Sequence, residues 1–532
     1  MKKVLASILA MTLLAGCGTS STSTTTSTKS SSSKSVAIAT DTDISSMNSS
    51  VATDGTSLQA LGLCMSGLVQ LDSDGVAQPD LAESWEVSDD SLTYTFHIRE
   101  DAKWSNGEDL TANDFVYAWN RLIDPDTASD YSFLIDTNAE TNTVNAESWE
   151  ATDDHTFVVH LSLPCDYFLT LMAFPSLYPL NEKFVEEEGD QYALSVDDMI
   201  YCGPYLMDSW TVGDSYSFVK NDQYWDADSY TENVDEINFR LIQGQSAILD
   251  YEAGNLDYVK LTSEVIDDYS DRDDVINYLS GYSWYLSLNY GNEYLSNLNI
   301  RKAIAYAVDT ETMCETVLKD GSVAAEGIVT KSTAINSDGK DYRDIAGNVT
   351  LGYDLDKAKE AFEAGCKELG VSTVELEFLY EDSDVTKNVA AYVMEALEKV
   401  GFTITGNCEP KKTRMSDMNN HDYDIGLTRW GPDYADPQTY MDLFNSKSNS
   451  NAGQYQSDEY DALMTAAEVT DAADAEKRWE DFAEAEKLLI SEDAAVVPLY
   501  QSGNTALQNP KLSGIEYHAA GVTGYRHLVL AD

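Results

Sequence analysis

Positive charge is scarce in this sequence. Lys and Arg together account for 33 of the 532 residues, against 92 Asp and Glu, so the formal net charge is −59. A surface this acidic repels phosphate groups, which argues against partners such as nucleic acid or anionic lipid surfaces. The charge favours solubility outside a cell. It could also favour cationic ligands, although a solvated acidic surface is a sufficient explanation.

Signatures of catalysis and of metal binding are missing as well. The sequence has no G-x-S-x-G elbow, no G-x-x-x-x-G-K-[ST] phosphate loop and no G-x-G-x-x-G turn. The six histidines are scattered, and no two cysteines form a C-x-x-C pair. Asp72-Ser73-Asp74-Gly75 begins like a calcium loop but lacks the closing acid, so we expect a hairpin turn there. We therefore expect no enzyme activity, no metal and no cofactor.

The N-terminus carries the one apolar run that looks like a targeting signal. Lys2 and Lys3 precede the apolar residues 4–15, which are too few for a comfortable membrane span and are typical of a secretory signal. Leu14-Ala15-Gly16-Cys17 resembles the bacterial lipobox, in which Cys17 would carry lipid (palmitate) and become the mature N-terminus. Residues 18–35 are nearly all Ser and Thr, and such a segment makes a flexible tether about 20–25 Å long. We expect a signal peptide over residues 1–17 and attachment to the membrane through Cys17 alone.

Six cysteines are left if Cys17 is lipidated, and an even number in an exported protein allows disulfide bonds. Most of them lie in apolar segments, where a free thiol behaves as a small hydrophobic side chain. We favour reduced thiols for all six. These are Cys64, Cys165, Cys202, Cys314, Cys366 and Cys408.

The body of the chain has about 500 residues, which is too many for one compact core, so two or three domains are expected. The first half is rich in strand patterns with alternating apolar residues. Thr111 has the character of a helix N-cap before Phe115. The sequence predicts strands over Val36–Ala39, Leu92–Ile98, Thr156–Leu163, Tyr216–Lys220, Glu236–Ile242 and Tyr282–Asn289, and a helix near Leu58–Leu68.

The second half alternates helix and strand patterns. This rhythm predicts a largely parallel sheet covered by helices. The predicted helices are Arg301–Lys319, Leu355–Leu369, a helix through Val385 and Leu397 that ends at Gly401, and Ala475–Ile490. The predicted strands are Val374–Tyr380, Phe402–Thr405, Asp422–Leu427 and Ala494–Tyr500.

The run Asp422–Pro437 combines a strand, a loop and a helix start. Its alternation puts Tyr423, Ile425 and Leu427 on one face of a short strand. Asp436-Pro437 is typical of a helix start, because Asp accepts hydrogen bonds from free amides and Pro suits the first turn.

The loop in this run holds one acid, Asp433, between Trp430 and Tyr434. Aromatic neighbours partly remove a carboxylate from water and so strengthen its attraction to a cation such as an ammonium group. A plain turn residue is the alternative interpretation of Asp433.

Several motifs, in order along nearly the whole mature chain, strongly resemble the extracellular solute-binding proteins of family 5. Within that family, Trp430–Pro437 resembles the oligopeptide-binding lipoproteins of Gram-positive ABC importers. The other motifs are Gln78–Trp85, Tyr94–Arg99, Ala102–Gly107, Leu110–Tyr117, Ser287–Asn289, Ile300–Asp309 and Val496–Tyr500.

The resemblance implies an α/β fold of the periplasmic-binding-protein kind, with two lobes around a ligand cleft and an inserted third subdomain. Strands near Tyr285 and Tyr500 would cross between the lobes and act as a hinge. The implied division is a first lobe of residues 35–61, 201–281 and 503–532, an insertion over residues 62–200, and a second lobe over residues 282–502.

The resemblance also implies the roles of residues at the site. Asp433 would pair with the α-ammonium of a peptide, and residues 430–433, Trp430 and Gly431 among them, would offer main-chain groups to its backbone. Tyr131 would face the ligand from the inserted subdomain, although a packed surface aromatic is an equal alternative. The segment around Gly55 would supply a facing strand. Nearby, Ser46-Met47-Asn48-Ser49 departs from the family's usual Leu-Asp-Pro-like turn.

The implied function is a monomeric receptor on the outer face of a bacterial cytoplasmic membrane, which binds oligopeptides and delivers them to an ABC permease. Other solutes known for the family, namely oligosaccharides, nickel and haem, are the alternative, and a surface hydrolase is a further one. Peptide length and side-chain preference are left open by the sequence.

Overall fold

The computed structural model describes residues 34–73, 75–136, 143–263, 265–336 and 339–531. The predicted signal peptide, Cys17 and nearly all of the predicted tether lie outside the described residues. Ser35, the last residue of the predicted tether, is the first residue of strand β1. No helix of the described part is long and apolar enough to cross a membrane.

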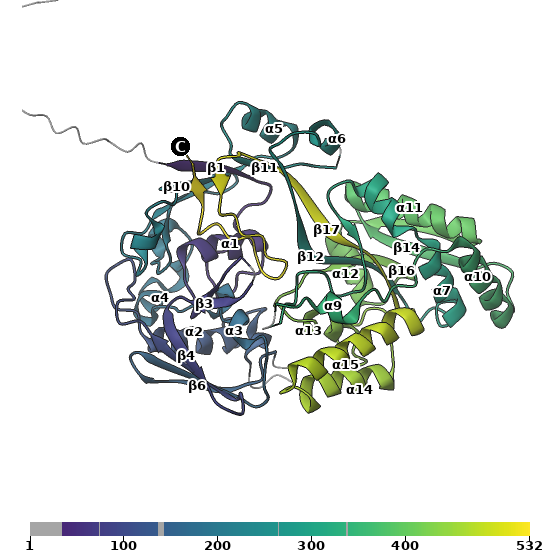
Figure 1. The fold of residues 1–532 in the computed structure, drawn as a ribbon, viewed down its shortest axis with the longest axis horizontal. Coiled ribbons are helices and arrows are strands. Elements are labelled where there is room, and N and C mark those ends of the chain that lie inside the picture. The colour runs from purple at the N-terminus through teal and green to yellow at the C-terminus, as the bar shows by residue number, and fades with distance from the viewer. Residues whose placement is uncertain (1–33, 74, 137–142, 264, 337–338, 532) are drawn as a thin grey trace, which may run out of the picture. The chain divides into compact units, whose positions relative to one another are not determined.

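The largest sheet has the strand order β15-β14-β16-β12-β17-β11-β1-β10-β9-β8, and β13 pairs with β17 (Figure 1). A separate sheet has the order β4-β5-β7-β6. The strands are β1 Ser35–Thr40, β2 Val69–Leu71, β3 Ala77–Pro79, β4 Ala82–Val87, β5 Thr93–Ile98, β6 Ala146–Asp153, β7 Thr156–Leu161, β8 Tyr205–Thr211, β9 Ser215–Lys220, β10 Glu236–Leu241, β11 Tyr258–Lys260, β12 Val275–Leu288, β13 Val323–Ala324, β14 Glu375–Glu381, β15 Thr403–Glu409, β16 Ile425–Trp430, β17 Val496–Gln508, β18 Leu512–Ser513 and β19 Val529–Leu530.

Most of the α-helices come between two of these strands along the sequence. They are α1 Gly55–Cys64, α2 Ala112–Ile123, α3 Phe168–Leu171, α4 Glu182–Glu188, α5 Gly244–Glu252, α6 Ile266–Tyr269, α7 Leu298–Ala307, α8 Thr310–Met313, α9 Tyr342–Ala346, α10 Leu355–Leu369, α11 Asp384–Val400, α12 Lys411–Asn419, α13 Gln438–Met441, α14 Asp458–Thr465 and α15 Ala475–Lys487. The predicted cap of α2 is confirmed, because the Asp114 carboxylate accepts from the Thr111 amide at 2.7 Å.

The expectation of a largely parallel sheet holds only in part, because six of the ten strand pairings in the largest sheet are antiparallel. Strands β14, β15 and β16 pair in parallel, as do β1, β10 and β11. Between these groups, β12 runs antiparallel to both β16 and β17. The alternation of helices and strands correctly predicts the parallel pairing of β14 with β15 and β16. It carries no information about β12 and β17, the two strands that join the groups.

Strands β12 and β17 connect two separate apolar cores. They have 14 and 13 residues and pair with each other along most of their length. At one end, Val275 and Leu507 pack with the core around α5 and β11. At the other end, Leu286 and Leu499 pack with the core formed by α7, α10 and α11 against β14 and β16 (Figure 1). The pairing register shifts between Leu279 and Ser283, so the ladder is irregular where the strands leave one core for the other.

The predicted helix over Arg301–Lys319 is broken in the structure. α7 ends at Ala307, and the Asp309 carboxylate accepts from the Thr312 amide at 3.0 Å, which starts α8. An N-cap inside a helical pattern ends one helix and begins another. The helix expected near Leu58–Leu68 is shifted for the same reason, since Asp54 caps α1 at Gly55 and the helix ends at Cys64.

Tyr423 does not share a face with Ile425 and Leu427. The two aliphatic side chains pack into the core beneath α7, α10 and α11, whereas Tyr423 packs with Leu379 and Met418. Strand β16 begins only at Ile425, so the alternation does not extend back to Tyr423.

Two smaller expectations are confirmed. The segment after Asp72 is a hairpin, because β2 and β3 pair antiparallel on either side of it. The six cysteines of the described part are free thiols, and five of them are buried.

Candidate functional site

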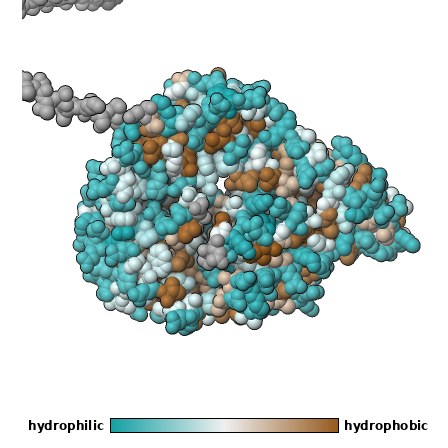
Figure 2. Space-filling model, viewed as in Figure 1, coloured by the Kyte–Doolittle hydropathy of each residue, from teal (hydrophilic) through white to brown (hydrophobic). Residues whose placement is uncertain are grey.

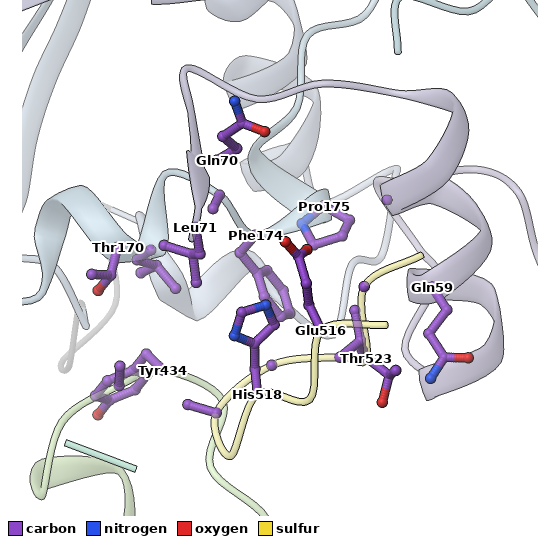
Figure 3. A pocket seen from close by; sticks show the side chains of 18 of the residues that line it. Gln59, Gln70, Leu71, Thr170, Phe174, Pro175, Tyr434, Glu516, His518 and Thr523 are labelled. Atoms are coloured by element: carbon purple, nitrogen blue, oxygen red, sulfur yellow. The ribbon is translucent and has the colours of Figure 1, made fainter. Parts of the chain in front are cut away.

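Two adjoining cavities lie between the N-terminal third of the chain, the loop after β16 and the C-terminal tail. The smaller cavity has a volume of about 120 Å³ and the larger one about 570 Å³. Figure 3 shows the smaller cavity, with Phe174 and Pro175 on one side and His518 and Thr523 of the tail on the other. The residues that line both cavities are Leu71, Thr170, Ala435, His518 and Ala520.

The loop that carries Asp433 is fixed at both ends. Gly431 follows β16, and a Cβ atom there would lie 2.5 Å from the ring of Tyr282, so only glycine fits without a shift. The Asp433 amide donates to the Thr439 hydroxyl at 3.2 Å. Asp436 accepts from the amide of Gln438, the first residue of α13, at 3.0 Å, which confirms the predicted helix start.

Asp433 lines the smaller cavity, and the residue is half-buried. Burial raises the pKa of its carboxyl group from 3.8 to about 6. Within the described part of the chain, no ion pair and no hydrogen bond reaches this carboxylate. A half-buried acid that lacks a cation is poised to bind one supplied by a ligand.

The other predicted ligand residues from this loop differ in their positions. Tyr434 lines the smaller cavity next to Asp433. Trp430 is the last residue of β16, and neither it nor Gly431 belongs to the lining of the two cavities. The main chain of Gly431 forms no hydrogen bond within the described residues, so it is free to pair with a ligand.

Tyr131 does not belong to the lining of either cavity. Its ring is 4.9 Å from the ring of Phe174, which does line the smaller cavity. Burial raises the pKa of Tyr131, and the charge of Asp433 adds to this rise, so the two side chains are near neighbours. The known contacts of Tyr131 are therefore those of a packed aromatic side chain. Its contact with a ligand stays a prediction.

The strand expected around Gly55 is wrong. Gly55 is the first residue of α1, because the Asp54 carboxylate accepts from the amide of Ser57 at 2.9 Å and caps the helix. Gly55 is exposed and lies outside the lining of both cavities.

A contact across the site holds the loop against the N-terminal third of the chain. The ring of Tyr434 stacks on Tyr167 at a centroid distance of 4.4 Å, and the Tyr167 hydroxyl donates to Gln438 at 3.3 Å. Arg478 of α15 donates twice to the Asp436 carboxylate, both at 2.7 Å, with both side chains buried. A bidentate buried pair of this kind fixes geometry as well as charge. Nothing in the sequence links Arg478 or Tyr167 to this loop, so sequence reasoning missed both.

The C-terminal tail supplies a second wall that sequence reasoning also missed. Glu516, His518 and Arg526 all line the smaller cavity. Arg526 is committed elsewhere, because it donates to the buried carboxylate of Asp80 at 2.8 Å and to the carbonyl of Gly62 at 2.6 Å. Within the described residues, no group of three or more His, Cys, Asp or Glu side chains could hold a metal ion.

The raised pKa of Asp433 predicts that the free energy of unfolding of the ligand-free protein depends on pH. Because the folded pKa is about 6 and the unfolded value 3.8, the folded state holds the extra proton between these values. Stability therefore falls as the pH rises through this range, by at most about 3 kcal/mol. We expect Asp433→Asn to be more stable than the wild type at pH 7.5 and to lose most of that advantage at pH 4. Urea unfolding of ligand-stripped protein measures the difference.

Asp422→Asn is the matched control, since this exposed acid lies in the same segment. It should change the unfolding midpoint little at either pH. An advantage of Asp433→Asn that is equal at pH 4 and pH 7.5 would show that the Asp433 carboxylate is not destabilised by burial.

Comparison with known proteins places the chain in a family. The sequence pattern described as "Bacterial extracellular solute-binding proteins, family 5 Middle" matches residues 76–452. The dipeptide-binding protein of Lactococcus lactis subsp. cremoris (strain MG1363) is 32% identical over 505 residues, which cover 90% of this chain and 91% of the relative.

Two solved structures are similar over 94% of this chain. One is an oligopeptide ABC transporter (substrate-binding domain) from Bacillus anthracis str. Ames, with 37% identity, a TM-score of 0.77 and 99% of that chain covered. The other is Listeria monocytogenes OppA bound to peptide, with 33% identity, a TM-score of 0.76 and 100% of that chain covered.

These likenesses confirm two predictions from the sequence. The α/β fold of the periplasmic-binding-protein kind is confirmed by both solved structures. A binding protein rather than an enzyme is confirmed by the family, whose members bind solutes. The chain belongs to the bacterial extracellular solute-binding proteins of family 5.

Proposed function

We propose that this protein is an extracytoplasmic peptide receptor, which binds the α-ammonium of a peptide at Asp433 and delivers the peptide to an ABC permease. The observation that carries the proposal is the half-buried Asp433 carboxylate in the cavity lining, for which the described residues provide no cation. The names of the similar proteins support it, since they include a dipeptide-binding protein, an oligopeptide ABC transporter and a protein bound to peptide.

The chemistry of peptides explains why one acid is enough. Every unmodified peptide has an α-ammonium and a repeating backbone, so an acid combined with free main-chain groups recognises peptides regardless of their side chains. Gly431, with its unused main-chain groups, lies two residues before Asp433. The larger cavity of about 570 Å³ then offers room for side chains together with water, which adapts to different shapes at small cost.

We also propose that the two lobes close on the peptide about β12 and β17. The lobes are those expected from the resemblance, residues 35–61, 201–281 and 503–532 for the first and residues 282–502 for the second, with residues 62–200 inserted in the first. The irregular pairing between Leu279 and Ser283 supports a hinge at this level, because a broken ladder bends more easily than a regular one.

Asp433→Asn should weaken the binding of a free-amine tripeptide by about thirty-fold or more, because the ammonium loses a desolvated partner. The same substitution should hardly alter the binding of the N-acetylated tripeptide, which has no charge at that end. Isothermal titration with both peptides on both proteins gives the four affinities.

Asp422→Asn again serves as the control and should leave the affinities of both peptides unchanged. Equal losses for the free and the acetylated peptide in Asp433→Asn would remove the proposed role of Asp433 in binding the ammonium. Binding of the acetylated peptide by the wild type as tightly as the free peptide would also contradict this role of Asp433.

We further propose that the receptor is held to the membrane by lipid on Cys17, as the lipobox-like sequence suggests. Cells grown with radioactive palmitate should label the wild-type protein, and Cys17→Ser should abolish the label and release the protein from the membrane fraction. A label that survives in Cys17→Ser would refute this anchor. The peptide proposal does not depend on this result.

A further inference from the structure

The smaller cavity contains a second acid that the peptide proposal does not use. Glu516 lines this cavity together with Asp433, and it comes from the C-terminal tail rather than from the loop after β16. Figure 3 shows Glu516 beside Phe174 and Pro175, with His518 next to it. The lining of the same small space of about 120 Å³ thus includes two acidic residues from separate parts of the chain.

The tail holds Glu516 in place through Gly524. The amide of each residue donates to the carbonyl of the other, at 2.9 Å from Glu516 and 2.8 Å from Gly524, which closes the loop of residues 516–524. A Cβ atom on Gly524 would lie 2.7 Å from the Glu516 carboxylate, so the glycine leaves the space that this carboxylate occupies. The acid is therefore seated at the cavity wall and has only 16% of its side-chain surface exposed.

The protein provides little countercharge for Glu516. Within the described residues, Nε2 of His527 is the basic atom that comes within 4 Å of its carboxylate, at 3.8 Å. Burial lowers the pKa of that histidine, so the ring is mostly neutral at pH 7. Arg526 lowers the pKa of Glu516, but burial outweighs it and raises the value to about 7. The pKa of His518 is also lowered by burial.

Apart from Arg526, no lysine or arginine among the described residues belongs to the lining of either cavity. The guanidinium of Arg526 is occupied by Asp80, by the carbonyls of Gly62 and Met65 and by the hydroxyl of Ser66. Among the described residues, a ligand that enters the smaller cavity thus meets two acids and no free cationic side chain.

We propose that Glu516 binds a cationic side chain on the first residue of the peptide, so that the receptor prefers peptides that begin with Lys or Arg. This inference rests on the proposed function, in which Asp433 holds the α-ammonium. The α-ammonium and the first side chain leave the same Cα atom, so a first residue bound at Asp433 directs its side chain into the space that Glu516 borders. The methylene groups of Lys or Arg would pack against Leu171, Phe174 and Tyr178 of the lining, with the charge at the acid.

The test compares two tripeptides that differ in one charge, Lys-Ala-Ala-amide and norleucine-Ala-Ala-amide. Norleucine keeps the methylene chain of Lys and lacks its ammonium, and the amide removes the C-terminal carboxylate. In isothermal titration at pH 7.5, the wild type should bind the Lys peptide about tenfold or more tightly, as expected for a hydrogen bond to a charged group. Glu516→Gln should bring the two affinities together and leave that of the norleucine peptide unchanged.

Glu232→Gln is the matched control, since Glu232 is exposed and lines neither cavity, and it should keep the wild-type preference. Equal affinities of the two peptides for the wild type would overturn the inference, as would a preference that survives in Glu516→Gln. The wild-type comparison decides the matter even if Glu516→Gln does not fold. Failure of the proposed function looks different, because then neither peptide would bind better than its N-acetylated form.

Discussion

An acid taken out of water without a cation beside it is the feature on which the candidate site depends. Burial of the Asp433 carboxylate disfavours its charged form, and the described residues offer no partner that would offset this cost. When a ligand ammonium binds, it offsets the unfavourable burial of the carboxylate. Relief of this burial therefore contributes to the free energy of binding. A site of this kind recognises the end of a peptide and leaves its sequence open.

The rest of the site keeps this acid in position. Gly431 lets the loop pass close to the ring of Tyr282, and the buried Arg478–Asp436 pair anchors the loop to α15. Tyr434 then stacks on Tyr167 from the N-terminal third of the chain. Because these contacts join segments far apart in the sequence, the cavity forms only when both parts of the chain come together. β12 and β17 are the strands that link their cores.

Figure 2 shows hydrophilic side chains over most of the face in view, in keeping with the acidic composition.

Local patterns predicted the local structure well and the long-range contacts poorly. α10 and α11 appear where apolar periodicity and the glycines after them predict. The break at Asp309 and the start of α1 at Gly55 depend on single capping acids, whose effect the apolar periodicity does not reveal.

The same contrast between local patterns and long-range contacts holds for the residues of the candidate site. Asp433 could be singled out because its aromatic neighbours and the family likeness lie in one short stretch. Glu516, Arg478 and Tyr167 come from distant segments without any motif, so only the folded chain reveals that they surround the same loop.

The central claim concerns the proton that Asp433 must give up to meet an ammonium. Titration of the tripeptide Ala-Ala-Ala-amide at pH 6, in two buffers of different ionisation enthalpy, counts the protons released on binding. With a pKa of about 6 in the free protein, Asp433 should release about half a proton per peptide, and the α-ammonium, already protonated at this pH, none. The release should vanish in Asp433→Asn. A wild type that releases no proton, or a variant that releases as many as the wild type, would contradict the account.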